Sequence, residues 1–330
     1  MHSIRLFVLL LFASLLVLGG GGGGERTIRA DDGDGDSDSG EVTLDVLEHW
    51  GRYAGAAYAA FEEWESCASC QASEDMRQTR LNATWSTSLP AFSRGFIGVN
   101  DRRRQVVVAF RGTTHVMDAL ADSQVAQAQW PLAETRVHVG FLLAYLSARQ
   151  TVQAALARLL LQLGGGLGEE APYSVVFVGH SLGAAQAVLA YVDFCLVCGS
   201  CCSVSSAVRL VTFGAPRVGN RRFAQLVNSL GSLGSLGSLG SLGSLGSAQL
   251  RVVLGSDIVP QLPRSLPLVD PDRYVHGDRE IWVRDGRALM LCAQSLEGQA
   301  EEDAQCSAST HAWRWSMLDH MAYPGMRLVF

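Results

Sequence analysis

The amino-acid sequence predicts an α/β fold, in which a mainly parallel central sheet is covered by helices on both faces. Short runs rich in Val, Leu and Phe alternate along the chain with longer helical segments. Strands that are apolar on both faces are typical of parallel sheets, because each crossover places a helix over the sheet. The expected strands are residues 105–110, 173–179, 207–214 and 250–255.

The segments between these strands favour helices. Residues 140–163 are rich in Leu and Ala and end at a run of glycines, which terminates helices. Residues 182–196 follow the second strand directly and continue the pattern. Near the end of the chain, two apolar runs over residues 280–292 flank Asp285–Gly286, a dipeptide that favours a tight hairpin turn.

The length of the chain favours a single large domain. Of the 330 residues, 1–24 are expected to be a signal peptide and 25–40 a polar linker rich in Gly and Asp. The domain itself, residues 41–330, is interrupted by a Ser-Leu-Gly repeat over 229–247. Without these segments about 270 residues remain, which is enough for one large core.

The N-terminal segment is typical of an export signal. Arg5 precedes an apolar run over residues 6–18 that is too short to span a bilayer unaided. An uncleaved anchor is the alternative, since residues 19–30 contain no clear cleavage site. Asn82 begins an Asn-Ala-Thr glycosylation sequon, which agrees with export. We therefore expect a protein that is secreted or resides in the lumen of the secretory pathway.

The Ser-Leu-Gly repeat places leucine at every third position. That period matches neither a strand nor a helix, and glycine opposes both. We expect a surface insertion, because a solenoid, the alternative, needs longer repeating units.

The composition excludes several classes of protein. All 26 basic residues are Arg, so the chain has no lysine for a Schiff base with pyridoxal phosphate, a Walker A motif or a protein-kinase site. The formal net charge of -6 gives no electrostatic footprint for nucleic acid.

Eight cysteines in an exported chain favour disulfides over metal ligands. The spacing allows Cys67 and Cys70 to close a very small loop, and Cys292 and Cys306 a longer one. The remaining four, which would also suit a zinc or iron–sulfur site, are Cys195, Cys198, Cys201 and Cys202. Because the compartment is oxidising, we expect disulfides there too, with the pairing left open, and neither a metal nor an organic cofactor.

The chemistry centres on the motif Gly179-His180-Ser181-Leu182-Gly183. It lies directly after an expected strand and before an expected helix, which is the setting of a nucleophile elbow. Such a turn strains the backbone of the central serine, and side chains two positions before and after it would collide. Glycines at both positions meet that need, and the N–H of Leu182 at the helix start is placed to stabilise an oxyanion.

A serine nucleophile needs a base, and in the α/β-hydrolase fold an acid and then a histidine follow the serine along the chain. Asp257 suits the acid because it comes directly after the expected strand 250–255. Asp270 and Asp272 lie further into a loop and are weaker candidates. The spacing alone does not choose among the three downstream histidines, His276, His311 and His320.

Several motifs, taken in order over about residues 45–328, resemble those of the class 3, or fungal-type, lipase family. They are Ala109-Phe-Arg-Gly-Thr-Thr114, Val137-His-Val-Gly-Phe141, the motif around Ser181, Phe213-Gly-Ala-Pro-Arg-Val-Gly219, Asp257-Ile-Val-Pro-Gln-Leu-Pro263 and Leu318-Asp-His320. This resemblance implies an α/β-hydrolase fold, with Ser181 as the nucleophile, Asp257 as the acid and His320 as the base.

The resemblance also implies roles for residues around this triad. Thr113 and Leu182 supply the backbone amides of the oxyanion hole, and Asp122 helps to hold the Thr113 hydroxyl. The pairs Cys67–Cys70 and Cys292–Cys306 match disulfides of the family. The other histidines have structural interpretations: His180 points away from the site, His138 is structural, and His276 and His311 lie on the surface or in loops.

The function that the resemblance implies is a secreted serine ester hydrolase that cleaves lipid acyl esters, most of all a triacylglycerol lipase. Its partner is a lipid or other ester at an oil–water or membrane interface, and no obligate protein partner is implied. Thr114–Gln124 occupies the place of the family's lid but has no aromatic residue, so we expect weak interfacial activation. The alternatives are a phospholipase, a galactolipase, a feruloyl-type esterase, an acyltransferase or an inactive lipid-binding protein of the same fold.

Overall fold

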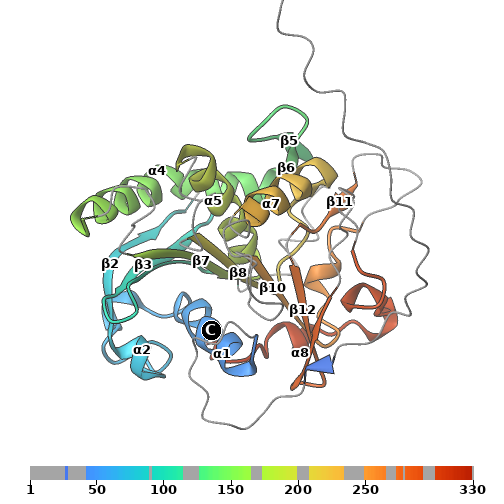
Figure 1. Ribbon diagram of the computed structural model, residues 1–330, viewed down its shortest axis with the longest axis horizontal. Coiled ribbons are helices and arrows are strands. Elements are labelled where there is room, and N and C mark those ends of the chain that lie inside the picture. Colours follow the sequence, from blue (N-terminus) through green and yellow to red (C-terminus); the bar gives the residue numbers. More distant parts are fainter. Residues whose placement is uncertain are drawn as a thin grey trace, which may run out of the picture.

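The computed structural model in Figure 1 describes the larger part of the chain. The described ranges are 27–28, 42–88, 91–113, 126–164, 173–198, 208–233, 249–264, 273–277, 279–292 and 302–328. Several expectations fall outside them: the signal peptide, most of the linker, Thr114–Gln124 with Asp122, most of the Ser-Leu-Gly repeat, Cys201, Cys202, Asp270 and Asp272.

A nine-stranded sheet forms the centre of the described structure, in the order β1-β13-β12-β10-β8-β7-β4-β3-β2. The strands from β4 through β7, β8 and β10 to β12 run parallel, and antiparallel strands flank them at both edges. Their bounds are β1 Thr27–Ile28, β2 Thr79–Ser86, β3 Arg94–Asn100, β4 Gln105–Phe110, β7 Ser174–His180, β8 Val208–Phe213, β10 Gln249–Leu254, β12 Arg279–Arg284 and β13 Ala288–Leu291.

Helices cover both faces of this sheet, with α4, α5 and α7 above it and α1, α2 and α8 below it in Figure 1. Their bounds are α1 Leu44–Ala56, α2 Glu74–Arg77, α4 Val139–Gln162, α5 Leu182–Cys198, α7 Arg221–Leu233 and α8 Met317–His320. Alternate residues of β4 belong to different cores. Val106 and Val108 pack with α4 and α5, whereas Val107 and Ala109 pack with α1. The predicted mainly parallel sheet with helices on both faces is confirmed.

The elements expected from the sequence are present close to their expected bounds. Strands β12 and β13 form the expected hairpin, and its turn residues Asp285 and Gly286 have φ values of 47° and 76°, as a tight hairpin turn requires. The sequence patterns did not predict α1, the antiparallel pair β2–β3 or a second small sheet. That sheet has the order β11-β9-β6-β5 and consists of β5 Gln127–Gln129, β6 Arg136–His138, β9 Gly219–Asn220 and β11 Tyr274–Val275.

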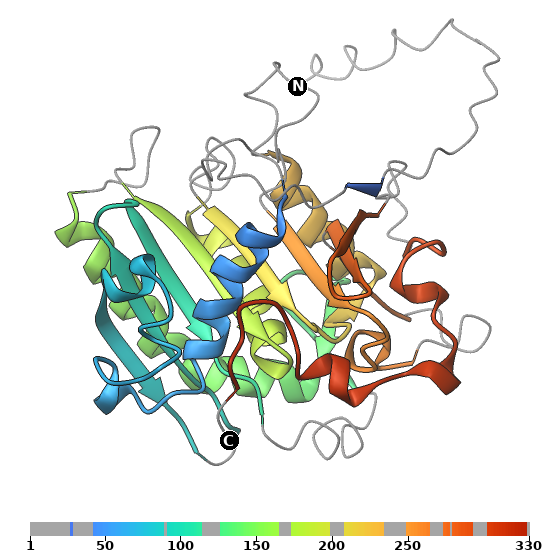
Figure 2. The same cartoon turned by 90° about the horizontal axis from the view of Figure 1, so that it is seen from below.

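The C-terminal segment packs closely along α1 at two glycines one helical turn apart. A Cβ on Gly51 would collide with the carbonyl oxygen of Pro324, and one on Gly55 would stand 3.3 Å from the nitrogen of Arg327. Figure 2 shows this red segment beside the blue helix α1. The contact holds the residues that follow His320 against the sheet.

The disulfides implied by the resemblance are present, since Cys67 is bonded to Cys70 and Cys292 to Cys306. Cys195 and Cys198 are also disulfide-bonded, so neither offers a thiolate to a metal.

The sequon asparagine, Asn82, lies on the outermost strand β2. Its side chain is exposed, and it is the residue at which the pairing of β2 with β3 shifts register. A bulge on an edge strand leaves this side chain open to solvent.

Among the described ranges, we find no helix with both the length and the apolar character needed to cross a bilayer.

The structure corrects two expected boundaries. Thr27–Ile28, within the expected linker, form β1 and pair with Leu289 and Met290. Residues 229–233, assigned to the repeat, continue α7, and Leu230 is buried in the core. Leu230 lies on the same helical face as Val227, and extending an existing helix costs less than starting one, so the helix runs into the repeat.

The repeat beyond α7 is not needed to connect the elements on either side of it. The Gln249 amide donates to the Val227 carbonyl at 2.6 Å, so the start of β10 lies beside α7. Leu233, the last residue of α7, is roughly 9 Å further along the helix axis at 1.5 Å per residue. If residues 236–246 are removed, four residues, 234–235 and 247–248, still connect α7 to β10. At about 3.3 Å per residue they are long enough to span that distance.

We predict that deleting residues 236–246 leaves the midpoint of thermal unfolding within about 2 °C of the wild type, because no described core residue is removed. Circular dichroism measures this. As the matched comparison, Leu230→Ala removes core volume and should lower the free energy of unfolding by about 2–3 kcal/mol. Loss of folding after the deletion would show that the repeat is structural.

His138 caps α4 and must be neutral to do so. Its Nδ1 accepts hydrogen bonds from the N–H groups of Gly140 and Phe141 at 3.1 and 3.3 Å. Burial lowers the pKa of His138 from 6.5 to about 4. The unfolded chain therefore binds a proton at this residue at pH values where the folded protein does not. The free energy of unfolding falls as the pH is lowered from about 6.5 towards 4.

We predict that His138→Asn makes the thermal midpoint less dependent on pH over that interval, because asparagine keeps an acceptor at the helix start but does not titrate. Thermal unfolding at a series of pH values measures the slope. His311→Asn is the control, since His311 is exposed and the variant should keep the wild-type slope. Equal slopes for the two variants would contradict the role assigned to His138.

Candidate active site

Ser181 occupies the turn between β7 and α5 in the strained conformation expected of a nucleophile elbow. Its φ is 59°, in the left-handed region, and the residue is fully buried. A Cβ on Gly179 would collide with the backbone of Gly183, and one on Gly183 would collide with the carbonyl of Phe110. The two glycines of the motif are thus required by close backbone approach.

Asp257 and His320 form a buried pair at the same edge of the sheet. Asp257 follows β10, His320 ends α8, and their exposed fractions are 1% and 0%. The His320 Nδ1 lies 2.8 Å from Asp257 Oδ2 and 3.0 Å from Oδ1, so Nδ1–H donates to the carboxylate. In the neutral ring this leaves Nε2 as a hydrogen-bond acceptor.

Ser181 and His320 both border the chain at Phe213–Gly214. The N–H of Ser181 donates to the Phe213 carbonyl at 3.0 Å, and a Cβ on Gly214 would stand 2.9 Å from His320 Nδ1. Ser181 Oγ and His320 Nε2 are both buried and make no hydrogen bond within the described ranges. A hydroxyl and an unoccupied acceptor nitrogen therefore lie in one covered site.

Gly214 leaves room for the Asp257 and His320 side chains. Its φ is 57°, and a Cβ there would also come within 2.8 Å of Asp257 Oδ2. The sequence indicated this glycine only as part of a family motif.

Tyr323 is a partner of Asp257 that the sequence did not reveal. Its hydroxyl donates to Asp257 Oδ2 at 2.6 Å and accepts from the Leu254 N–H at 3.2 Å. Burial and the charge of Asp257 raise the pKa of Tyr323 well above 10, so it remains a donor. The N–H of Val259 donates to Asp257 Oδ1 at 2.8 Å, and the carboxylate is thus fully partnered.

His180, expected to point away from the site, instead contacts the backbone of His320. Its Nε2 donates to the His320 carbonyl at 2.9 Å, so its Nδ1 accepts from the Tyr58 hydroxyl at 2.8 Å. The His180 and His320 rings are 4.5 Å apart. Burial and the charge of His320 keep the pKa of His180 well below 6.5, so a second positive charge does not compete with His320.

Tyr58 also contacts the segment that is expected to form the oxyanion hole. The backbone of Gly112 forms a hydrogen bond with the Tyr58 hydroxyl, and a Cβ on Gly112 would stand 3.1 Å from Ser181 Cβ. Thr113 therefore follows a backbone that packs directly on Ser181. Leu182 is the first residue of α5, whose positive dipole end lies at the site.

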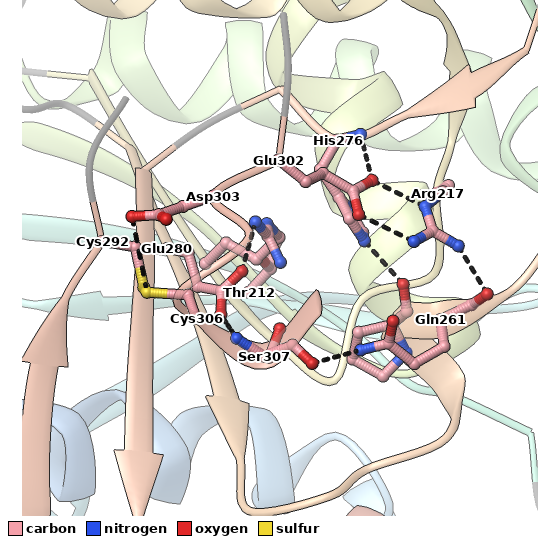
Figure 3. A network of polar contacts seen from close by, with 12 residues as sticks. Thr212, Arg217, Gln261, His276, Glu280, Cys292, Glu302, Asp303, Cys306 and Ser307 are labelled. Atoms are coloured by element: carbon pink, nitrogen blue, oxygen red, sulfur yellow. Dashed lines mark hydrogen bonds and ion pairs between the residues drawn. A yellow bond between two sulfur atoms is a disulfide. The ribbon is translucent and has the colours of Figure 1, made fainter. Parts of the chain in front are cut away.

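A network of polar contacts joins Arg217, His276 and Glu302 to Gln261, four residues after Asp257 (Figure 3). Arg217 binds Glu302 through two contacts of 2.6 and 2.7 Å and also donates to the carbonyls of Gln261 and Pro263. Burial alone would raise the pKa of Glu302, but hydrogen bonds from Arg217 and the neighbouring positive charge lower it below its usual range. This ion pair fixes the loop that begins at Asp257.

His276 belongs to this network: it lies in a loop, one of the two expected positions, but it is buried and not on the surface. The side chain is buried, its Nε2 donates to the Pro260 carbonyl at 2.8 Å, and its backbone N–H donates to Glu302 at 3.2 Å. Burial and the charge of Arg251 hold its pKa well below 6.5. His311 is exposed, as expected.

One group of potential metal ligands occurs among the described residues, near this network. Atoms of Glu280, Cys292 and Cys306 lie within 4.8 Å of one another. Both sulfurs are consumed by the disulfide, so the group lacks the thiolates that a metal needs.

Comparisons with known proteins agree with this geometry. The model of the family described as lipase (class 3) matches residues 107–266. A lipase of Rhizomucor miehei is 29% identical over 80% of this chain, which spans 62% of that relative's length. A secreted mono- and diacylglycerol lipase of Penicillium cyclopium is 27% identical, with 86% of this chain and 88% of the relative covered.

A solved structure gives the same result. A triacylglycerol lipase whose catalytic centre is a serine protease triad superposes with a TM-score of 0.70 at 26% identity, covering 92% of this chain and 97% of its own. The chain thus resembles the class 3 lipases over most of its length and has the α/β-hydrolase fold.

Proposed function

We propose that this protein is an exported serine ester hydrolase that cleaves acyl esters of lipids, with triacylglycerol as the first substrate to test. The observation that carries the proposal is the buried Asp257–His320 pair beside Ser181. Within the described ranges, the Ser181 hydroxyl and the His320 Nε2 have no other partner to occupy them. A serine nucleophile and its general base need such an arrangement.

In the proposed reaction, His320 Nε2 takes the proton of Ser181 as Oγ attacks the ester carbonyl carbon. Asp257 stabilises the imidazolium that forms, since both its oxygens lie against Nδ1. His320 then gives the proton to the departing alcohol, and the acyl group stays on Ser181 Oγ. A water molecule deprotonated by the same histidine attacks the acyl-enzyme and releases the carboxylic acid.

The negative charge on the carbonyl oxygen is stabilised by the backbone amides of Thr113 and Leu182. The position of Leu182 at the start of α5 supports its role, because the dipole end of a helix favours an anion. The close packing of Gly112 on Ser181 supports that of Thr113. The proposal includes Asp122 as the residue that holds the Thr113 hydroxyl.

Two features favour lipids and export. The relatives described above are lipases, and the Penicillium protein acts on mono- and diacylglycerols and is secreted. The disulfides of this chain are also typical of an oxidising compartment. The substrate is then a lipid ester presented at an interface.

We predict that Ser181→Ala and His320→Ala abolish most hydrolysis of tributyrin by the purified protein, whereas Asp257→Asn lowers kcat on the order of ten-thousandfold. Titration of the released acid at constant pH measures the rate. Near-normal turnover by Ser181→Ala would contradict the proposal.

A second measurement separates a lipase from an esterase. The rate of tributyrin hydrolysis by the wild type is followed as the substrate concentration passes its solubility limit. A jump in rate when droplets form indicates a lipase, and saturation below the limit indicates an esterase.

We predict that Tyr58→Phe lowers kcat about 10- to 100-fold and changes KM by less than about twofold, because the Gly112 backbone and His180 lose their shared hydroxyl. The affinity for an alkyl boronic acid, which mimics the tetrahedral intermediate, should fall in parallel. Tyr173→Phe is the control, since that hydroxyl contacts Asp101 instead. An unchanged kcat together with unchanged boronate affinity would show that the hydroxyl plays no part in positioning.

A further inference from the structure

Two arginines, Arg94 and Arg111, face each other across β3 and β4. Gly95 pairs with Phe110, and the Arg111 N–H donates to the Arg94 carbonyl at 2.8 Å, so these arginines form the next pair outward. Directly opposed residues of antiparallel strands place their side chains on one face, with Cβ atoms about 5 Å apart. Like charges in such a position destabilise a sheet unless an anion lies near them.

The part of the chain that the structure describes supplies no counter-charge to this arginine pair. No carboxylate lies within ion-pair distance of either guanidinium, and the Nε of each is buried without an acceptor. Arg94 donates one side-chain hydrogen bond, to the Ala59 carbonyl at 3.0 Å. Other buried or half-buried arginines do contact carboxylates: Arg149 with Asp193, Arg217 with Glu302 and Arg251 with Glu280.

Aromatic rings hold the two guanidinium groups in position. The Cζ of Arg94 lies 4.7 Å from the centre of the Phe61 ring, and that of Arg111 lies 5.5 Å from the centre of the Tyr58 ring. Burial and the charge of Arg94 lower the pKa of Arg111, although a guanidinium stays charged at neutral pH. Both side chains are partly exposed, so their charges are fixed in place and reachable from solvent.

The arginine pair adjoins the proposed catalytic site. Arg111 directly precedes Gly112, whose backbone packs on Ser181. The Tyr58 ring under Arg111 carries the hydroxyl that donates to His180. An anion bound by the pair would therefore lie at the same edge of the sheet as an ester bound at Ser181.

We propose that Arg94 and Arg111 form a subsite for the anionic head group of a lipid substrate, a phosphate diester. This inference rests on the proposed function. Guanidinium groups bind phosphate oxygens through charge-assisted, bidentate hydrogen bonds, and the two partly exposed side chains of the pair supply such groups. A neutral acylglycerol places no charge there, so the subsite favours an anionic acylglycerol over a neutral one.

The test compares two soluble substrates that differ in head group, dihexanoylphosphatidylglycerol and dihexanoylglycerol, below their aggregation limits. We expect Arg94→Gln to lower kcat/KM for the phosphatidylglycerol about tenfold, mainly through KM, and to change that for the diacylglycerol less than about twofold. Arg94→Lys keeps the positive charge but lacks the planar, two-pronged donors of a guanidinium. Its kcat/KM for the phosphatidylglycerol should therefore lie between those of the wild type and Arg94→Gln. Arg158→Gln, an exposed position on the opposite face of the sheet, is the matched control and should alter neither.

A binding measurement separates the subsite from the catalytic proposal. The Ser181→Ala protein is titrated calorimetrically with dihexanoylphosphatidylglycerol and, in a second arm, with inorganic phosphate. We expect the lipid to bind more tightly than phosphate, and Arg94→Gln in the same background to weaken lipid binding about tenfold. If the wild type hydrolyses neither substrate, the proposed function fails, and this titration still decides on the subsite.

Three results would overturn the inference. Equal losses of kcat/KM on both substrates would make Arg94 a residue that supports the fold. Inorganic phosphate binding as tightly as the lipid would make the pair a site for a free anion. Lipid binding that is unchanged by Arg94→Gln would show that the pair does not contact the head group.

Discussion

The burial of one carboxylate, that of Asp257, is the constraint on which the arrangement of this edge of the sheet depends. An unpartnered buried charge costs several kcal/mol, so every direction around it must supply a donor. The donors come from separate parts of the chain: the His320 ring, the Tyr323 hydroxyl and the Val259 N–H. The turn after β10, the helix α8 and the C-terminal segment therefore converge on one point, and α1 holds that segment in place through Gly51 and Gly55.

The loop that carries Asp257 is held at its far end by a second buried charge pair. Arg217 bridges the Gln261 and Pro263 carbonyls to Glu302, and Glu302 belongs to the segment that the Cys292–Cys306 disulfide closes. A buried ion pair adds little net stability, but it admits few alternative arrangements of the groups that it joins. We interpret this network as fixing the direction of the acid rather than as a source of stability.

The sequence predicted those parts of the molecule that depend on local patterns. Apolar runs predicted the parallel strands, and the glycines around Ser181 predicted the strained turn. Both patterns report on interactions between residues that are close together in the chain. The order of serine, acid and histidine along an α/β-hydrolase chain pointed to Asp257 as the acid. Only the family resemblance selected His320 among three histidines. Tyr58, Tyr323 and the arginine pair were missed, since their roles rest on contacts between segments far apart in sequence. The burial of His276 was missed for the same reason: it follows from Pro260 and Glu302 packing over this loop residue.

The chain order of the converging elements has a consequence for biosynthesis. Ser181 and Asp257 precede His320, which is placed only when α8 and the C-terminal segment have packed beside α1. A growing chain that has folded β4, β7 and β8 already contains the elbow and its glycines, yet lacks the base. If the proposed activity holds, the chain becomes competent only when α8 has docked and His320 lies beside Asp257.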